Sequence, residues 1–125
     1  MNPPVSRGVI LFAHGSRDPL WRLPMEAVAA RVAARPGSPA VRCAYLELTA
    51  PDLPTAAAEL ASLGLAQVAI VPMFLGAGRH VREDLPALVA QLRERYPAVD
   101  WRLQRPVGED ERLLDLLADL ALGGA

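Results

Sequence analysis

The sequence contains two histidines, and each lies on a glycine-containing loop after a hydrophobic run. His14 directly follows the run at residues 9–13, and His80 follows the run at 68–75 after a loop with two glycines. Continuous apolar runs rich in Val and Ile are typical of parallel strands that are buried on both faces. Because ligands of open parallel sheets bind at the carboxyl ends of the strands, we expect one site that holds both imidazoles.

A carboxylate, Glu47, follows a further apolar segment at residues 40–46. If the three strands are neighbours, the side chains of His14, Glu47 and His80 converge over one edge of the sheet. Two imidazoles and a carboxylate suit a divalent ion such as cobalt, nickel, iron or zinc, and leave coordination positions open. The residue types also allow histidines that bind loop backbone, or that act as acids and bases without metal.

Strand and helix patterns alternate four times along the chain. Apolar segments predict strands at residues 8–13, 40–46, 67–73 and 99–103. Helical patterns follow them: the first runs from Asp18 to Arg35, with Pro24 bending or restarting it, and the second from Asp52 to near Gly64. The third carries Val81 and ends at Pro97, and the fourth begins with the acids near residue 110. This order predicts an α/β domain whose four-stranded, mostly parallel sheet has helices on both faces.

The fourth helix is rich in leucine. We expect a stripe that faces the core, made of Leu113, Leu116, Leu117 and Leu120. Leu114 widens this apolar face and also permits a dimer contact. At the other end of the chain, residues 1–7 are expected to form a flexible arm before a single domain at 8–125.

Composition excludes several classes of function. The chain has 125 residues, of which 52% are hydrophobic and 22% charged, with a net charge of −1. That charge gives no bulk attraction to nucleic acid or to an anionic membrane, so we expect neither as a partner. No apolar run approaches the roughly 20 residues that span a bilayer. The lone Cys43 and the absence of a secretory segment predict a cytoplasmic protein.

All 13 cationic residues are arginine, and none is lysine. This excludes a Schiff-base lysine and a phosphate-loop lysine within the chain. Guanidinium groups bind carboxylates through two parallel hydrogen bonds. Arg17, Arg79 and Arg82 lie beside the predicted site, where they could bind an acidic substrate or simply pair with neighbouring acids.

The chain resembles the CbiX-type sirohydrochlorin cobaltochelatases, which belong to the ATP-independent class II chelatases. The resemblance rests on residues 11–18 (LFAHGSRD), 45–48 (YLEL) with 51–53 (PDL), 71–86 (VPMFLGAGRHVREDLP) and 106–110 (PVGED). These blocks occur in order over nearly the whole chain, and the third is the most specific.

The resemblance implies a fold, an activity and a site. The fold is half of a two-domain class II chelatase, and the reaction inserts Co²⁺, or Ni²⁺ or Fe²⁺, into sirohydrochlorin in cobalamin or siroheme-type biosynthesis, without ATP or an organic cofactor. His14 and His80 are then the metal-binding and catalytic histidines. Because longer members contain two such halves, the resemblance also implies a homodimer that builds the tetrapyrrole cleft between two copies.

The residues suit this chemistry. Inserting a metal requires the ion to lose water, two pyrrole protons to leave and the flat ring to distort. Neutral imidazoles can hold the ion weakly and accept a proton near neutral pH. Glu47 could be a third ligand or could receive the second proton, and the three arginines could bind the carboxylates of sirohydrochlorin.

Two other functions are considered. A non-catalytic carrier of metal or tetrapyrrole needs the same weak, open site. A histidine phosphatase places an arginine before the histidine that follows its first strand, whereas this chain has Ala13 at that position.

Overall fold

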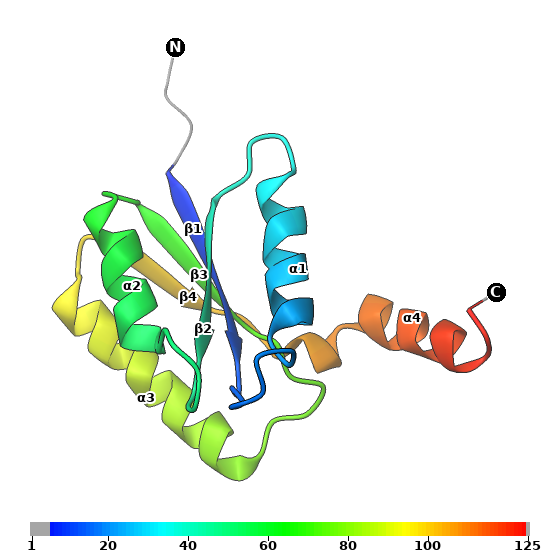
Figure 1. The fold of residues 1–125 in the computed structure, drawn as a ribbon. Coiled ribbons are helices and arrows are strands. Elements are labelled where there is room, and N and C mark those ends of the chain that lie inside the picture. The colour runs from blue at the N-terminus through cyan, green and yellow to red at the C-terminus, as the bar shows by residue number, and fades with distance from the viewer. Residues whose placement is uncertain (1–5, 125) are drawn as a thin grey trace.

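Four parallel strands form the centre of the structure, a computed structural model that describes residues 6–124 (Figure 1). Their bounds are β1 Arg7–Ala13, β2 Ala40–Tyr45, β3 Gln67–Pro72 and β4 Asp100–Leu103. The spatial order is β2-β1-β3-β4, and every neighbouring pair is parallel. The predicted four-stranded parallel sheet is therefore confirmed, and each strand ends within one residue of its expected limits.

Helices cover both faces of the sheet. The covering helices are α1 Leu23–Ala33, α2 Leu53–Ser62 and α3 Arg79–Arg95. A short 3₁₀ helix, η1, at Val107–Glu109 and a fourth helix, α4, at Glu111–Ala121 follow β4. Figure 1 shows α2 and α3 together on one face of the sheet and α1 on the other. The prediction of helices on both faces is confirmed.

Alternate residues of β1, β2 and β3 contribute to two separate cores, one on each face of the sheet. Ile10, Phe12 and Ile70 belong to the larger core, which α2 and α3 complete. Leu11 and Ala13 belong to the smaller core, which α1 completes. Burial of both faces explains the continuous apolar runs that predicted these strands.

The first helix begins later than expected. The expected start was Asp18, but α1 begins at Leu23, because Pro24 lacks an amide hydrogen and is tolerated only in a first turn. Asp18 instead organises the preceding turn, where its Oδ1 accepts a hydrogen bond from the Leu20 amide at 2.9 Å. The second helix begins where expected, and the Asp52 side chain caps it by accepting a hydrogen bond from the Thr55 amide.

The expected N-terminal arm at residues 1–7 overlaps the start of β1. Arg7 is the first residue of β1, and the Ser6 carbonyl accepts a hydrogen bond from the Ala66 amide at 2.9 Å. Residues 6 and 7 therefore belong to the folded domain. Residues 1–5 of that arm and Ala125 lie outside the described residues.

The expected core packing of the last helix is wrong. α4 has no buried residue, and Leu116 and Leu120 are 53% and 59% exposed. Figure 1 shows α4, in orange and red, projecting away from the rest of the domain. The leucine stripe is present, but the core of its own chain does not bury it.

No helix among residues 6–124 is both long enough and apolar enough to cross a membrane.

Backbone pairing between β1 and β2 continues into the loops beyond the strands. The Leu46 amide donates to the Ala13 carbonyl at 2.9 Å, and the Glu47 amide donates to the His14 carbonyl at 3.0 Å. Gly15 follows with φ +101°, and a Cβ at this position would collide with the Glu47 carbonyl. Only glycine allows this close approach, so Gly15 holds the two loops together.

We expect Gly15→Ala to destabilise the fold more than Gly37→Ala does. Gly37 also has a positive φ, +67°, but a Cβ there meets no atom within 4 Å, so it is a matched control. Backbone strain alone predicts a loss of about 1–2 kcal/mol at Gly37, and strain plus the collision about 3 kcal/mol or more at Gly15. Urea unfolding measures both free energies, and equal losses would show that the His14 loop rearranges without cost.

Candidate functional site

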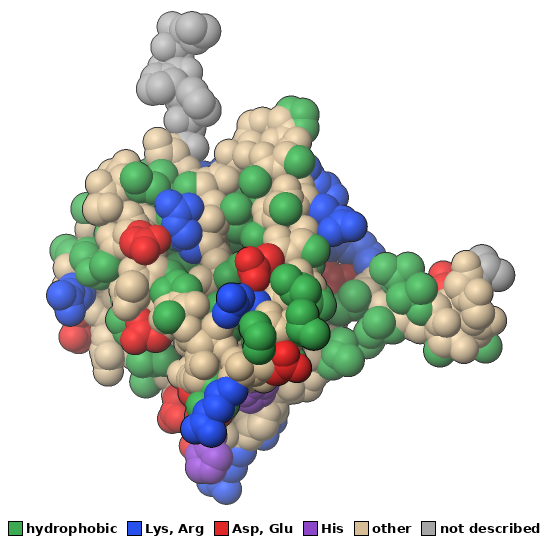
Figure 2. Space-filling view, in the orientation of Figure 1, with side chains coloured by type: hydrophobic (Ala, Val, Ile, Leu, Met, Phe, Trp, Pro, Cys, Tyr) green, Lys and Arg blue, Asp and Glu red, His purple; other side chains and the backbone are tan. Residues whose placement is uncertain are grey.

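The loops that carry His14, Glu47 and His80 lie at the same edge of the sheet. His14 directly follows β1, Glu47 lies two residues after β2, and His80 is the second residue of α3, which follows β3. Because β1 pairs with both β2 and β3, the carboxyl ends of these strands are adjacent. Figure 2 shows the histidine side chains, in purple, at one end of the molecule with arginine and acidic side chains around them.

An aromatic side chain supports the first imidazole. The His14 and Phe74 rings lie 4.7 Å apart between centroids, tilted by 57°, and the Phe74 ring meets Phe12 edge to face at 6.0 Å. Phe74 is buried, whereas His14 is exposed. Sequence reasoning placed Phe74 only in an apolar run, because that pattern does not show that the residue leaves the strand and lies under the histidine.

Polar side chains also couple the loops after β1 and β2. The Ser16 amide donates to Thr49 Oγ1 at 3.0 Å, and that hydroxyl donates to the Ser16 carbonyl at 2.6 Å. Leu48, the residue between Glu47 and Thr49, has a φ of 64°, a left-handed conformation that is strained for leucine. The segment that carries Glu47 is therefore held by its neighbours in a conformation that it would not adopt alone. Sequence reasoning missed the role of Thr49, which no local pattern signals.

Glu47 lines a hollow of its own in the loop between β2 and α2. That hollow is formed by residues 45–52 with Thr55, and its lining includes neither histidine. Among residues 6–124, no three His, Cys, Asp or Glu side chains lie close enough together to hold one metal ion. The structure thus brings His14, Glu47 and His80 to one edge without gathering them into a three-ligand cluster.

The first turn of α3 gathers positive charge beside His80. Arg79 and Arg82 flank the histidine, and the helix N-terminus adds unpaired amide hydrogens and the positive end of the dipole. Arg79 pairs with Glu83 at 3.1 Å, but these side chains are 81% and 61% exposed, so the pair contributes little stability. Arg17 and Arg82 have no ion-pair partner within the described part of the chain. This turn is therefore able to bind a carboxylate.

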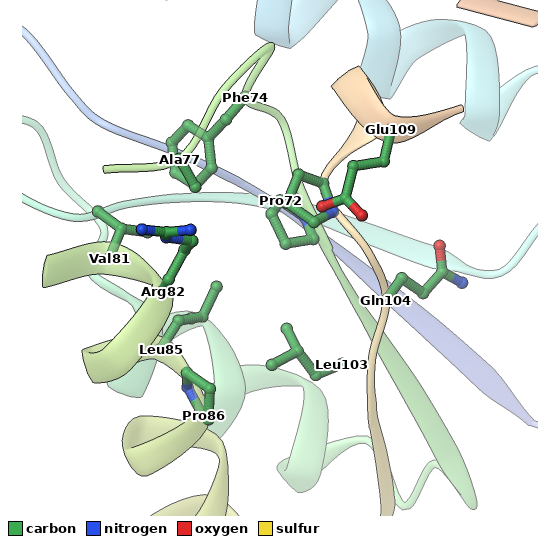
Figure 3. A pocket seen from close by; sticks show the side chains of 11 residues that line it. Pro72, Phe74, Ala77, Val81, Arg82, Leu85, Pro86, Leu103, Gln104 and Glu109 are labelled. Atoms are coloured by element: carbon green, nitrogen blue, oxygen red, sulfur yellow. The ribbon is translucent and has the colours of Figure 1, made fainter. Parts of the chain in front are cut away.

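A mostly apolar cavity of about 140 Å³ opens between α3 and the segment after β4. Figure 3 shows Arg82 at its α3 side and Glu109 at its η1 side, with Phe74 and the apolar side chains between them. The full lining is Pro72, Phe74, Ala77, Val81, Arg82, Leu85, Pro86, Leu103, Gln104, Pro106 and Glu109. Phe74 lies between this cavity and His14, because its ring lines the cavity and contacts the first imidazole.

Large apolar side chains are exposed in the loops at the same edge. Leu20 and Leu75 are 68% and 67% exposed, Leu48 is 54% exposed, and Leu46 and Trp21 are 38% and 37% exposed. We call these five residues the apolar rim. Contiguous exposed apolar groups are uncommon on monomeric proteins and mark surfaces for ligands or partners. An exposed His pair, arginines and an apolar rim together suit a flat, acidic, largely apolar molecule.

The chain matches some known proteins over nearly all of their length and others over about half of it. The CbiX family model matches residues 8–122. The chain is 30% identical over 112 residues to a chloroplastic sirohydrochlorin ferrochelatase from Arabidopsis thaliana, covering 90% of this chain and 50% of that protein. It is 28% identical to a sirohydrochlorin cobaltochelatase from Methanococcoides burtonii, covering 92% and 94%. The chain thus spans half the length of the plant relative and nearly all of the archaeal one.

Solved structures show the same fold. A CbiX protein from Marinobacter aquaeolei VT8 superposes with a TM-score of 0.80 at 35% identity, covering 94% of this chain and 96% of that one. The sirohydrochlorin chelatase SirB from Bacillus subtilis subspecies spizizenii, solved in complex with cobalt, gives a TM-score of 0.78 at 24% identity, and the match covers 51% of that chain. The expectation of a chelatase half-domain fold is confirmed. With the family model matched over residues 8–122, the chain belongs to the CbiX family.

Proposed function

We propose that this chain inserts a divalent metal ion into sirohydrochlorin without ATP, with Co²⁺ as the preferred ion and Ni²⁺ or Fe²⁺ as alternatives. The observation that carries the proposal is the placement of His14 and His80 at one sheet edge in a chain of the CbiX family. Relatives named for both cobalt and iron insertion support the reaction class. A cytoplasmic location and a role in cobalamin or siroheme-type biosynthesis belong to the same proposal.

In the proposed reaction the metal ion is a substrate that the two imidazoles hold before transfer. The ion replaces the protons of two pyrrole N–H groups, so the products are the metallated ring and two protons. The ring nitrogens replace His14 and His80 as ligands of the ion, and a freed imidazole then accepts a proton. Both side chains are exposed. An exposed pair without a third clustered ligand binds the ion weakly, as transfer to the product requires.

Glu47 is proposed to accept the second proton. Its position in a separate hollow at the same edge favours this role over that of a third metal ligand. The backbone hydrogen bond from the Glu47 amide to the His14 carbonyl keeps its loop beside the first histidine. A carboxylate on a loop beside the first histidine can receive a proton through a bridging water.

Arg17, Arg79 and Arg82 are proposed to bind the carboxylates of sirohydrochlorin. Arg82 lines the cavity, whereas Arg79 is held only by an exposed pair with Glu83 that a substrate carboxylate can replace. Guanidinium groups bind carboxylates in a fixed two-pronged geometry, so they orient the ring as well as attract it. The apolar rim then covers the rest of the macrocycle.

Two copies of the chain are proposed to form the complete cleft. The chain matches 50% of the plant relative's length, so a second copy supplies the equivalent of the other half. The apolar rim supports this arrangement, because one copy leaves Leu20 and Leu75 about two-thirds exposed. A tetrapyrrole between two such rims would be enclosed on both sides.

The first prediction concerns the reaction itself. Incubated anaerobically with sirohydrochlorin and each of Co²⁺, Ni²⁺ and Fe²⁺, the protein should accelerate metallation, fastest with Co²⁺, as followed by absorbance. Several turnovers per chain under excess substrate would separate an enzyme from a carrier, which stops after one equivalent. No acceleration with any of the three ions would reject the proposed activity.

The second prediction concerns the histidines. His80→Ala and His14→Ala should each lower the metallation rate about 100-fold or more, because each removes a metal ligand and a proton acceptor. Glu94→Gln, an exposed position near the opposite end of α3, is the control and should leave the rate unchanged. Full activity in both alanine variants would place the chemistry elsewhere on the chain.

The third prediction concerns substrate binding. Arg82→Ala should raise KM for sirohydrochlorin about tenfold with a smaller change in kcat, since a charged hydrogen bond is worth about 1.5 kcal/mol or more in binding. Arg95→Ala, at the last residue of α3, is the matched control. A loss in kcat alone would instead assign Arg82 to the chemical step.

A further inference from the structure

The helix α4 carries an apolar surface that its own chain leaves uncovered. At 100° per residue, the leucines and Ala121 fall on one side of the helix, while Glu111, Asp115 and Asp119 fall on the other. No residue of α4 is buried, and Leu116, Leu120 and Leu114 are 53%, 59% and 41% exposed. Figure 2 shows hydrophobic side chains gathered along the projecting helix. A strongly amphipathic helix of this kind requires an apolar partner surface.

The part of the sheet formed by β3 and β4 is also uncovered on the face that α1 occupies. Within residues 6–124, α1 is the only helix that packs on its face of the sheet, whereas α2 and α3 share the other face (Figure 1). On the face of α1, Val71 in β3 and Met73 just after it are only partly buried, and Arg102 in β4 and Gln104 just after it are exposed. The surface over β3 and β4, beside α1, therefore lacks a covering helix; it is apolar along β3 and polar along β4, where Arg102 pairs with Asp100.

The connection before α4 directs the helix away from this surface. The Gly108 amide in η1 donates to the Phe74 carbonyl at 2.9 Å, and a Cβ at Gly108 would collide with the Leu75 carbonyl. The Asp110 side chain then caps α4 by accepting from the Arg112 amide at 2.8 Å. Because η1 is held against the loop after β3, the direction in which α4 leaves the domain is set before the helix begins.

We propose that α4 is exchanged between two copies of this chain, each α4 covering the β3 and β4 surface of the other copy. The proposal rests on the homodimer included in the proposed function. The geometry favours a second copy of this chain as the partner, because the uncovered helix and the uncovered sheet surface lie on the same chain. In a two-fold symmetric dimer, each copy's α4 would cover the sheet surface of the other copy. Eleven residues of α4 extend over about 16 Å, comparable with the six-residue β3 at about 20 Å.

Cross-linking between differently tagged chains tests the exchange. One chain carries Leu117→Cys and the other Val71→Cys, both with Cys43→Ala so that no other thiol is present. After co-expression, a short bismaleimide should join the two chains into a covalent heterodimer. Ala118→Cys, on the polar side of α4, replaces Leu117→Cys as the control and should give little product. In a single chain with both cysteines, a link within that chain, or no link, would overturn the proposal.

The mass in solution provides a second measurement that does not depend on cross-linking. Leu116→Asp should raise the dimer dissociation constant about 100-fold, while Ala118→Asp, with the same added charge, should leave it nearly unchanged. Light scattering after size-exclusion chromatography measures both variants, and circular dichroism shows whether they fold. Equal dimerisation of the two folded variants would show that α4 does not form the contact.

Metallation assays on the same samples separate this proposal from the proposed function. A cysteine-pair sample that metallates sirohydrochlorin but gives no link between chains would overturn the exchange and leave the chelatase proposal standing. A cross-linked dimer without metallation would do the reverse.

Discussion

The pairing of β1 with a parallel neighbour on each side is the interaction on which the rest of the structure depends. β1 pairs with β2 from Gly8 to Ala13 and with β3 from Arg7 to Phe12, so the three strands end at nearly the same level. Burial on both faces by α1 and by α2 with α3 makes this register costly to shift, because a slip by one residue would exchange the two cores. The edge that carries both histidines is a direct consequence of that register.

The loops at this edge are held in place by several contacts, although many of their side chains are exposed to solvent. Backbone hydrogen bonds continue past Ala13 into the histidine loop, Gly15 allows the loop after β2 to approach, and Thr49 links the two loops again. Phe74 supports the His14 ring from the core side. The site therefore combines fixed positions with exposed donor atoms. That combination suits a metal ion that must be held briefly and then released into a ring.

The helices are distributed unequally over the two faces of the sheet. One face of the sheet has two covering helices and the other has one, while the fourth helix lies off the domain. The apolar rim leaves Leu20 and Leu75 exposed beside the histidines. A second copy would cover both the exposed sheet surface and the apolar rim. Relatives of about twice this length are long enough to contain two such units in one chain. In the proposed dimer, assembly and substrate enclosure would use the same exposed surfaces.

The sequence by itself determined the strands, their parallel arrangement and the edge at which the histidines lie, because a strand buried on both faces is visible as a local apolar run. It did not determine the start of α1, where Pro24 limits the helix more strictly than the apolar pattern showed. It also did not reveal that Phe74 leaves its strand to lie under His14, or that Glu47 lines a separate hollow. The largest difference is α4, whose leucines predicted core packing in its own chain. Periodicity reports that a helix has a face to bury, but the surface available to bury it depends on where η1 directs the chain, and only the tertiary structure decides that.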